Sequence, residues 1–521
     1  MTEFSTPPDL GLRLSSLPSV AVADEGGSRR WRSLWRLHFY SGMFAIPFIV
    51  LMACTGLVIL YTQPLRSLTE GHLRNVAVEQ TARSLDDQTS SVEKAFPKAI
   101  VTSLTVGVKP SNSTIFSIDD GSKSGRQVFV DPYSAKVLGS NKADGGVVGL
   151  ANRLHGFLNI NSLKVPLPTV SALWDGGAVM RPYIVFDLLL EVLGVWTLVL
   201  VLSGLYLWWP RRSKTVGGGA TTDQRTPSKR GLFRVRFNAG GRARWRDLHG
   251  MSGVLLLSAM LVTVVSGLAW STYWGPNFSA LANKITPNTW TDAPPSAVGK
   301  RGDLDRFGNQ IPWNTADAPI PASYRLTKLK TVPAPLGLDA VNRVAASEKM
   351  KPGYQISFPK NVVDKATGQT AYGSFTLSNS WPRKTGEANS VYVDQFTGKT
   401  LGATNAYGYG AVSYGLDALV STHMGTQLGI FSRIMMTSLC VLSLWSITSA
   451  LVMYTKRRRP GTAGLPRRPV DVKFAKRMTV STWVMAVMFP AWGLTAAFVL
   501  GIDRFVIRRN RRMRVAFGQR A

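Results

Sequence analysis

The feature that most constrains this chain is an apolar stretch that opens with a histidine and occurs twice. Residues 35–61 read WRLHFYSGMFAIPFIVLMACTGLVILY, and residues 245–270 read WRDLHGMSGVLLLSAMLVTVVSGLAW. Each is long enough to cross a bilayer, which takes about 20 apolar residues. The stretches also agree at small and polar positions: His38 with His249, Ser41-Gly42 with Ser252-Gly253, and Thr55-Gly56 with Ser266-Gly267. Unrelated apolar helices would not share these positions, so the pattern predicts an internal duplication.

The rest of the chain repeats in the same order. A second apolar stretch ends in SGLYLWWPRR and a fourth in SALVMYTKRR, while VFVDPYSAKVLG and VYVDQFTGKTLG match over twelve positions in the polar segments. Alternating strand patterns and short helical patterns in those segments indicate α+β modules. The predicted parts are a disordered cytoplasmic tail (1–30), a first span (31–62), a first extracytoplasmic α+β module (63–182), a second span (183–209), a basic cytoplasmic loop (210–247), a third span (248–270), a second extracytoplasmic α+β module (271–425), a fourth span (426–455), a second basic cytoplasmic loop (456–477), a fifth apolar stretch (478–503) and a basic tail (504–521).

The Lys and Arg residues are placed as expected for a protein that crosses a membrane several times. The net charge of +31 would suggest a nucleic-acid partner if it covered a soluble domain, but it lies in the segments that flank the spans. We therefore expect both modules outside a bacterial cytoplasmic (inner) membrane, and no nucleic acid. The fifth stretch leaves two alternatives, a full span or a re-entrant hairpin bent near Pro490. Both cysteines, Cys54 and Cys440, lie in spans, which excludes a disulfide framework.

Four of the five histidines lie at membrane boundaries. His38 and His249 begin spans that run outward, and His155 and His423 precede spans that run inward, so we expect one pair at each side of the bilayer. Imidazole is an axial ligand of haem iron, and a haem between helices needs a ring from each side and small residues near the porphyrin. Such residues are Ser41, Gly42, Ser252, Gly253, Gly156 and Gly425. The pattern predicts two b-type haems, although a single histidine at an interface is ordinarily a polar anchor.

Other residues leave their roles open. Asp187 and Glu191 are acids inside a span, where they would serve transport, a ligand histidine or the propionate region of a haem. Trp270, Tyr273 and Trp274 form either an interfacial belt or a mouth for a bulky ligand.

For two residue pairs and one histidine, the sequence favours a structural role. The pairs Thr55-Gly56 and Ser266-Gly267 are typical of helix packing, and His72 is expected at the surface. His155 lies 48 residues before Ser203 but His423 only 26 before Ser449, so 22 extra residues must loop out after His155.

These motifs carry a resemblance to a known family. The stretches LHFYSGMFAIPF, SGLYLWWPRR, RDLHGMSG and STHMG, with the two hairpin motifs between them, resemble the PepSY-associated transmembrane proteins, in particular the iron-regulated branch that includes siderophore reductases. The resemblance covers most of residues 30–460. It implies two b-type haems, with His38, His155, His249 and His423 as axial ligands, and reduction of ferric siderophores at the outer face.

The expected mechanism is one-electron reduction of chelated Fe(III), with release of Fe(II) and no catalytic residue beyond the haems. No GxGxxG strand-turn-helix is present, so the electron would come from a separate donor, a cytoplasmic reductase or quinol. Two other classes stay open. A regulatory or binding protein built on PepSY modules would need no haem, and a metal or siderophore permease would use acids inside the membrane.

Overall fold

The computed structural model of the protein describes residues 25–158, 163–169, 180–209, 235–237, 241–271, 273–286, 288, 290, 292, 294, 297–304, 311, 313–316, 318–323, 332–363, 368–379, 383–458, 464–465 and 472–517. Most of the predicted tail and of the two predicted basic loops lies outside these residues. The predicted disorder of residues 1–30 is wrong for its last part, because the first helix begins at Glu25. No proline follows Pro18 before this helix, and the arginines and leucines of its first turns favour helix.

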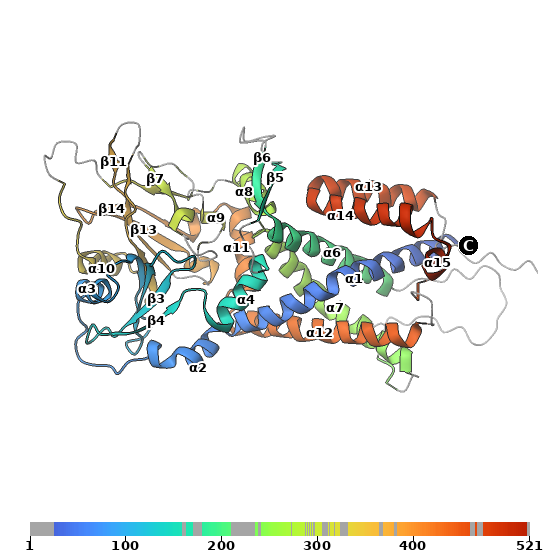
Figure 1. Ribbon diagram of the computed structural model, residues 1–521, viewed down its shortest axis with the longest axis horizontal. Coiled ribbons are helices and arrows are strands. Elements are labelled where there is room, and N and C mark those ends of the chain that lie inside the picture. The colour runs from blue at the N-terminus through green and yellow to red at the C-terminus, as the bar shows by residue number, and fades with distance from the viewer. Residues whose placement is uncertain are drawn as a thin grey trace, which may run out of the picture.

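Four long apolar helices lie side by side and form a bundle (Figure 1). They are α1 (Glu25–Leu60), α6 (Val185–Trp208), α7 (Gly241–Leu268) and α12 (Ile430–Arg457). With a helix over residues 490–507, five helices of the described chain are long and apolar enough to cross a membrane.

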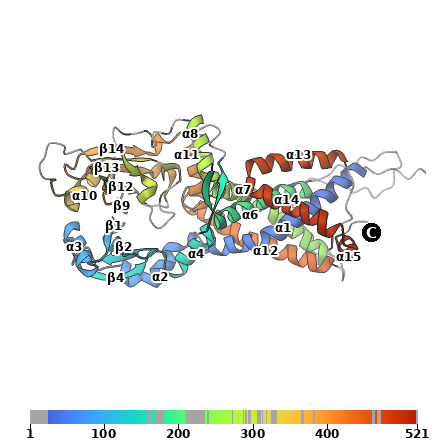
Figure 2. The ribbon, with the colours of Figure 1, turned by 45° about the horizontal axis from the view of Figure 1, so that its top comes forward.

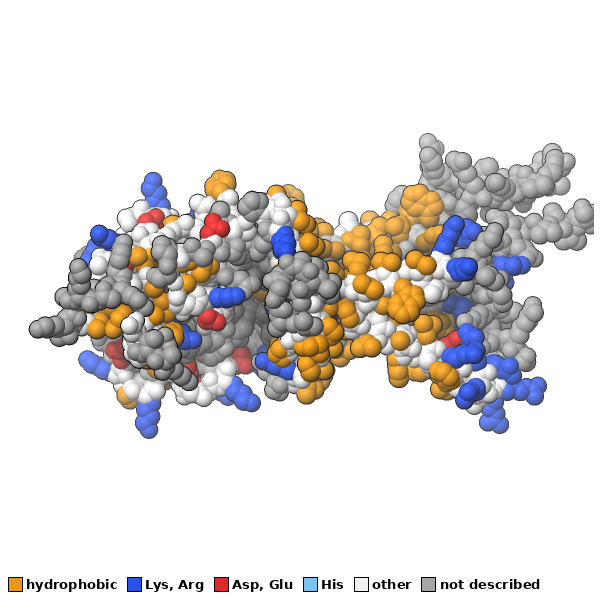
Figure 3. All heavy atoms as spheres, turned by 90° about the horizontal axis from the view of Figure 1, so that it is seen from above, with side chains coloured by type: hydrophobic (Ala, Val, Ile, Leu, Met, Phe, Trp, Pro, Cys, Tyr) orange, Lys and Arg blue, Asp and Glu red, His pale blue; other side chains and the backbone are white. Residues whose placement is uncertain are grey.

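The bundle is apolar outside and polar inside. Leu255 is 60% exposed and Phe431 74%, whereas Ser266 and Ser449 are fully buried between the helices. Small residues at such contacts let helix backbones approach one another in a lipid environment. Figure 3 shows apolar side chains over this part of the surface, with Lys and Arg gathered at the end away from the sheet. We call that end the basic end.

The fifth apolar stretch forms a helical hairpin. α13 (Val472–Met488) and α14 (Pro490–Gly501) run side by side, and α14 continues as a π-helical segment (Ile502–Ile507) (Figure 1). The chain reverses at Phe489, and Pro490 then begins α14, where its missing N–H costs nothing. The two arms are close, because a Cβ added to Gly493 would lie 2.7 Å from the Ala486 Cβ.

The hairpin returns the chain to the basic end. α15 (Arg511–Ala516) follows the hairpin, and Arg36 Nη1 of α1 donates a hydrogen bond to the carbonyl oxygen of Phe517 over 2.8 Å. Of the two alternatives for residues 478–503, the structure contains the hairpin. It is deeper than expected, because α13 begins at Val472 and its tip ring, Phe489, packs on Trp274 just beyond the opposite end of α7.

At the other end of the bundle lies an eight-stranded antiparallel sheet (Figure 2). The strand order is β14-β13-β12-β9-β1-β2-β3-β4. The strands are β1 (Ile100–Thr105), β2 (Thr114–Asp119), β3 (Arg126–Val130), β4 (Val137–Lys142), β9 (Tyr354–Ser357), β12 (Ser374–Asn379), β13 (Asn389–Asp394) and β14 (Thr400–Asn405). These agree with the predicted strands and hairpins.

The two polar segments share this sheet. The central strands β1 and β9 come from different segments and pair antiparallel, with Leu104 opposite Ile356. The expectation of two separate modules, 63–182 and 271–425, is wrong in this respect, because each segment offers an edge strand whose unpaired backbone groups are satisfied by the other. A pairing across 252 residues leaves no trace in local sequence patterns.

One helix from each segment covers the sheet. α3 (Leu85–Ala95) and α10 (Leu338–Ser347) pack into a single core that includes Leu104 and Ile356. Each helix caps the other: Asp339 Oδ1 accepts from the Leu85 backbone N–H over 2.9 Å, and Asp86 Oδ1 accepts from the Leu338 N–H over 2.6 Å. Carboxylates at helix N-termini also favour the helix dipole.

Shorter elements complete the chain. They are α2 (Thr62–Arg74), α4 (Gly146–Phe157), β5 (Lys164–Pro168), β6 (Met180–Ile184), α8 (Trp274–Ile285), β7 (Ala297–Lys300), α9 (Trp313–Ala316), β8 (Pro319–Pro321), β10 (Val362–Val363), β11 (Thr370–Ala371), α11 (Ala411–His423) and 3-10 turns at Arg301–Leu304, Thr385–Glu387 and Ala406–Gly408. The β5–β6 hairpin lies within the extra residues that follow His155.

Candidate functional site

The structure brings the four boundary histidines together in two pairs. His38 of α1 and His249 of α7 have ring centroids 6.2 Å apart and ring planes at 72°. His155, near the end of α4, and His423, at the end of α11, also have centroids 6.2 Å apart, with planes at 68°. We call the first the basic-end pair and the second the sheet-end pair. Each pair takes one histidine from each half of the chain.

At the sheet-end pair, two hydroxyl groups fix the tautomer of the rings. Thr55 Oγ1 donates to the Leu51 carbonyl over 2.7 Å, so its only hydrogen is committed, and it accepts from His155 Nδ1 over 2.9 Å. Ser266 Oγ likewise donates to the Val262 carbonyl (2.7 Å) and accepts from His423 Nδ1 (2.9 Å). A hydroxyl has one hydrogen to give, so both imidazoles carry their proton on Nδ1.

At the basic-end pair, backbone carbonyls lead to the same tautomer. His38 Nδ1 lies 3.0 Å from the carbonyl oxygen of Leu200, and His249 Nδ1 lies 3.0 Å from that of Ser446. A carbonyl can only accept, so each Nδ1 is the donor. Serine hydroxyls lie beside these contacts, that of Ser203 at 3.2 Å from His38 Nδ1, and those of Ser446 and Ser449 at 3.1 Å and 3.3 Å from His249 Nδ1.

All four rings therefore keep the Nε2 lone pair for another partner. Among the described residues no hydrogen bond to any histidine Nε2 is found. Two imidazoles that share one metal, at about 2.0–2.1 Å from each nitrogen, have ring centres roughly 6 Å apart. The 6.2 Å separation in both pairs fits this arrangement.

The number of ligands narrows the kind of metal. The described residues contain no group of three or more His, Cys, Asp or Glu that could hold an ion. Structural zinc needs four protein ligands, whereas haem iron takes four nitrogens from the porphyrin and needs only two axial ligands. Two facing imidazoles with fixed tautomers fit a haem better than a bare ion.

Glycines let the helix backbones approach two of the four rings closely. All four histidines are only half-buried although they lie among the helices. A Cβ added to Gly204 would lie 3.0 Å from His38 Cε1, and one added to Gly56 would lie 3.5 Å from His155 Cε1. At these positions a larger residue would crowd the rings, and the backbone of the facing helix comes close because none is present.

The small residues predicted to give room have mixed positions. A Cβ on Gly253 would meet nothing within 4 Å, but one on Gly42 would meet Leu200 at 3.5 Å. Ser252 Oγ bonds the carbonyl of His249, and Ser41 is fully buried. The last two residues predicted to leave room for a porphyrin, Gly156 and Gly425, differ in their surroundings. Gly156 lies in α4 next to His155, whereas Gly425 has φ +73° and a Cβ there would lie 2.5 Å from Leu60 Cδ1, so Gly425 serves a turn.

Sequence reasoning missed the partners of Nδ1. Thr55 and Ser266 were interpreted as packing residues, and Ser203 and Ser449 served only to align the two halves. The signal that could have found them is their repetition at fixed distances from the histidines, because a polar residue repeated in an apolar span needs a hydrogen-bond partner.

Of the two intramembrane acids, Glu191 forms its described hydrogen bonds with residues other than the histidines. Glu191 is 2% exposed, and its Oε2 accepts from Ser271 Oγ over 2.6 Å and from the Trp274 N–H over 3.3 Å. The interpretation of Glu191 as a hydrogen-bond partner of a ligand histidine is therefore wrong, because its described bonds go to the α7–α8 junction. Asp187 is also buried, in the first turn of α6.

The aromatic residues beyond α7 do not line an open mouth. Tyr273 is 2% exposed and its ring packs on Tyr183 at 5.1 Å between centroids, while Trp274 packs on Phe489 of the hairpin, also at 5.1 Å. Trp270 is half-buried at the end of α7. The hairpin, which was not placed from sequence, covers these rings.

A buried ion pair fixes the sheet to the helix that carries His423. Arg383 Nη1 lies 3.4 Å from Asp417 Oδ2 of α11, and Arg383 Nη2 donates to Tyr409 Oη over 3.1 Å. Burial raises the pKa of Tyr409 to about 12, so it stays a neutral phenol. The Thr385 N–H also donates to Gln427 Oε1 over 2.9 Å. The position of His423 is thus tied to the sheet.

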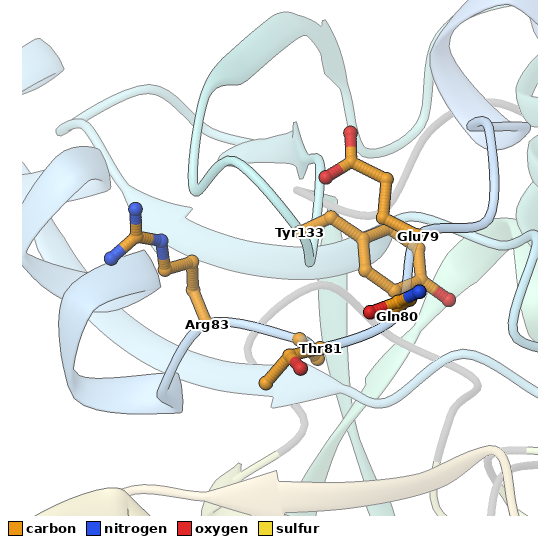
Figure 4. A pocket seen from close by; sticks show the side chains of 6 residues that line it. Glu79, Gln80, Thr81, Arg83 and Tyr133 are labelled. Carbon is orange, nitrogen blue, oxygen red and sulfur yellow. The ribbon is translucent and has the colours of Figure 1, made fainter.

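A hollow in the surface lies away from both pairs. It has a volume of about 680 Å³ and is lined by Glu79, Gln80, Thr81, Ala82, Arg83 and Tyr133, on the sheet side of the molecule (Figure 4). His72, expected at the surface, is exposed in α2 and belongs to neither pair.

The fold and the site define a class: an integral membrane protein whose apolar helices hold two histidine pairs beneath one shared sheet. Residues 35–457 match the model of the PepSY-associated TM region, and the chain belongs to that family. A search of curated proteins finds no match to this chain. The matched range includes all four paired histidines, and the α13–α14 hairpin lies beyond it.

Proposed function

We propose that this protein is a di-haem membrane oxidoreductase that reduces siderophore-bound ferric iron. The observation that carries the proposal is the geometry of the two pairs. In each, both Nδ1 atoms donate to fixed acceptors, neither Nε2 has a hydrogen-bond partner in the described part of the chain, and the ring centres are 6.2 Å apart. Without a metal, four imidazole nitrogens aligned in two facing pairs would have no partner among the described residues.

The residues of the chain hold and orient the cofactor. His38 and His249 would be the axial ligands at the basic end, and His155 and His423 at the sheet end. Their hydroxyl and carbonyl partners prevent rotation of the rings, as outer hydrogen bonds do for metal-binding histidines in general. A bound haem supplies a one-electron couple at its iron.

The proposed orientation places the basic end in the cytoplasm. Arg29, Arg30, Arg32 and Arg36 lie in the first turns of α1, and Arg457 and Arg458 lie at the end of α12. Lys and Arg concentrate on the cytoplasmic side of bacterial inner-membrane proteins. The shared sheet and the sheet-end pair would then face the periplasm, and the two pairs would offer an electron a path across the bilayer.

The substrate is proposed from the resemblance to siderophore reductases. A siderophore holds Fe(III) with hard oxygen ligands, and one added electron gives Fe(II), which such ligands hold less tightly. The reaction takes one electron per iron and needs no proton. The donor is a separate cytoplasmic reductase or quinol.

An optical spectrum tests the cofactor. Protein purified in detergent, oxidised and then reduced with dithionite, should show the bands of two low-spin haems per chain. His38→Ala and His423→Ala should each remove one haem, and His72→Ala, a histidine outside both pairs, should remove none. A colourless but folded preparation would refute the proposal and favour a regulatory protein.

The substrate has its own test. Protein reduced without oxygen is mixed with a ferric hydroxamate siderophore and a ferrous-specific chelator. The haem bands should reoxidise as coloured ferrous chelate appears, one iron per electron. Haem that stays reduced in the presence of several classes of ferric siderophore would leave a di-haem protein with a different electron acceptor.

A further inference from the structure

The two pairs differ in what accepts the Nδ1 hydrogen. At the basic end, both histidines face a backbone carbonyl, with one serine hydroxyl beside it at His38 and two, those of Ser446 and Ser449, at His249. At the sheet end, both face only a hydroxyl oxygen, that of Thr55 or Ser266. The difference follows depth in the bundle rather than half of the chain, because each pattern occurs once in each half.

The acceptor affects how strongly an imidazole binds a metal. A strong acceptor at Nδ1 draws the proton away from the ring and makes Nε2 a more basic ligand. An amide carbonyl carries two lone pairs and a partial negative charge, whereas a hydroxyl is a weaker acceptor. A more basic axial ligand stabilises Fe(III) relative to Fe(II), and so lowers the reduction potential of a haem.

We propose that Thr55 and Ser266 are positioning residues that give the sheet-end site a higher reduction potential than the basic-end site. The inference rests on the proposed haem ligation and deepens it. An electron that enters from the basic end would come to rest at the sheet end, beside the domain that faces the proposed chelate. The hydroxyls act through His155 and His423 and need not touch the substrate.

The cations of the basic end act in the opposite sense. A positive charge near a haem favours Fe(II) and would raise the potential of the basic-end site. Arg36 is the buried cation nearest to His38 in sequence, and its guanidinium is engaged by the Phe517 carbonyl and Tyr40 Oη. Exposed arginines are screened by salt over about 10 Å at 0.1 M. The titration below is therefore run at low and at high salt.

The test is a spectroscopic redox titration of the purified holoprotein. Wild type should show two couples, and the one lost in His38→Ala should be the lower at both salt concentrations. Thr55→Val with Ser266→Ala removes both acceptors and should raise only the higher couple. The expected shift is about tenfold in the equilibrium constant, or about 59 mV for one electron.

Matched variants give the controls. Thr55→Ser and Ser266→Thr keep a hydroxyl and should keep the wild-type potentials. Ser203→Ala with Ser449→Ala keeps the carbonyl acceptors and should leave the higher couple unchanged. If Thr55→Val prevents haem binding at the sheet end, Ser266→Ala alone carries the test, since it leaves the contact between Thr55 and His155 in place.

The outcomes separate this inference from the proposed function. Wild type without haem would refute the proposed function itself. Wild type with two haems whose potentials do not respond to loss of the two hydroxyls would refute only this inference. A higher couple that disappears in His38→Ala would also refute it, because the order of the potentials would be reversed.

Discussion

The two halves of the chain, residues 35–209 and 245–457, agree most closely where they meet. Each pair joins one histidine from each half, with the same 6.2 Å separation and ring planes at 72° and 68°. Away from the pairs the halves differ. Glu191 corresponds in the second half to Thr437, which is only half-buried and bonds Tyr61 Oη at 3.0 Å. Sites shared between the halves constrain both, whereas outer surfaces are free to diverge.

The largest expected effect concerns the shared sites. If each pair holds one cofactor, His249→Ala should remove the same haem as His38→Ala, and the double variant should lose no more than either single one. His38→Ala with His423→Ala should lose both haems. Haem content per chain, measured as the pyridine adduct, checks this. Stepwise loss of half a haem for each histidine within a pair would contradict a site shared by the two halves.

The ion pairs that hold the histidine-bearing short helices differ in burial. Arg383 and Asp417 at α11 are 8% and 1% exposed, whereas Arg153 and Asp144 at α4 are 33% and 35% exposed. Removing one partner of a buried pair costs about 3–5 kcal/mol, and an exposed pair contributes about 0–1 kcal/mol. Asp417→Ala should therefore lower the midpoint of thermal unfolding far more than Asp144→Ala. Equal shifts of the unfolding midpoint would mean that burial does not make the Arg383–Asp417 ion pair more important for stability than the Arg153–Asp144 pair.

Glu191 and Thr437 offer the next comparison. Glu191→Leu would leave the Ser271 hydroxyl and the Trp274 N–H without their acceptor in a buried place, at a cost of about 1–3 kcal/mol. Glu191→Gln keeps a carbonyl oxygen and should lose much less. Thr437→Val, at the corresponding position, should change stability by at most about 0.5 kcal/mol. Thermal unfolding in one detergent measures all three, and a Gln variant as damaged as the Leu variant would show that the charge itself is needed.

The order of the elements could be predicted from sequence because it rests on local patterns. Apolar length placed the spans, and period-two alternation placed β1 to β4, β9 and β12 to β14. The histidines that open the two matching apolar stretches, His38 and His249, were placed at the same depth. That the two polar segments share one sheet could not be predicted, because the pairing of Leu104 with Ile356 joins strands that lie far apart in the sequence.

The partners of the histidines were beyond sequence reasoning for a different reason. Whether Thr55 faces His155 or lipid depends on the rotation of α1 against α4, and an apolar span gives little periodic signal for rotation. Pro490 predicts the break after Phe489, since the residue before a proline disfavours the helical conformation. Whether the second arm packs back on the first depends on tertiary contacts such as that of Gly493 with Ala486.

The smallest expected effect compares the two matching hairpins of the sheet. Ala135 has φ +57°, and the corresponding residue in the second half, Gly398, has φ +71°. The left-handed conformation costs a residue with a Cβ about 1–2 kcal/mol, partly offset by the flexibility that glycine adds to the unfolded chain. Ala135→Gly should therefore stabilise the protein by up to about 1 kcal/mol.

The reverse change, Gly398→Ala, should destabilise by about 1–2 kcal/mol, since its Cβ would also lie 3.1 Å from Leu336 Cδ1. Hydrogen exchange of the β3–β4 and β13–β14 hairpins measures both variants locally. Because each turn keeps the aspartate that accepts from the N–H two residues on, Asp131 from Tyr133 and Asp394 from Phe396, both turns are held by the same contact. Stability changes of opposite sign in the two variants would therefore identify the backbone conformation at this one position as the cause. Changes of the same sign would exclude it.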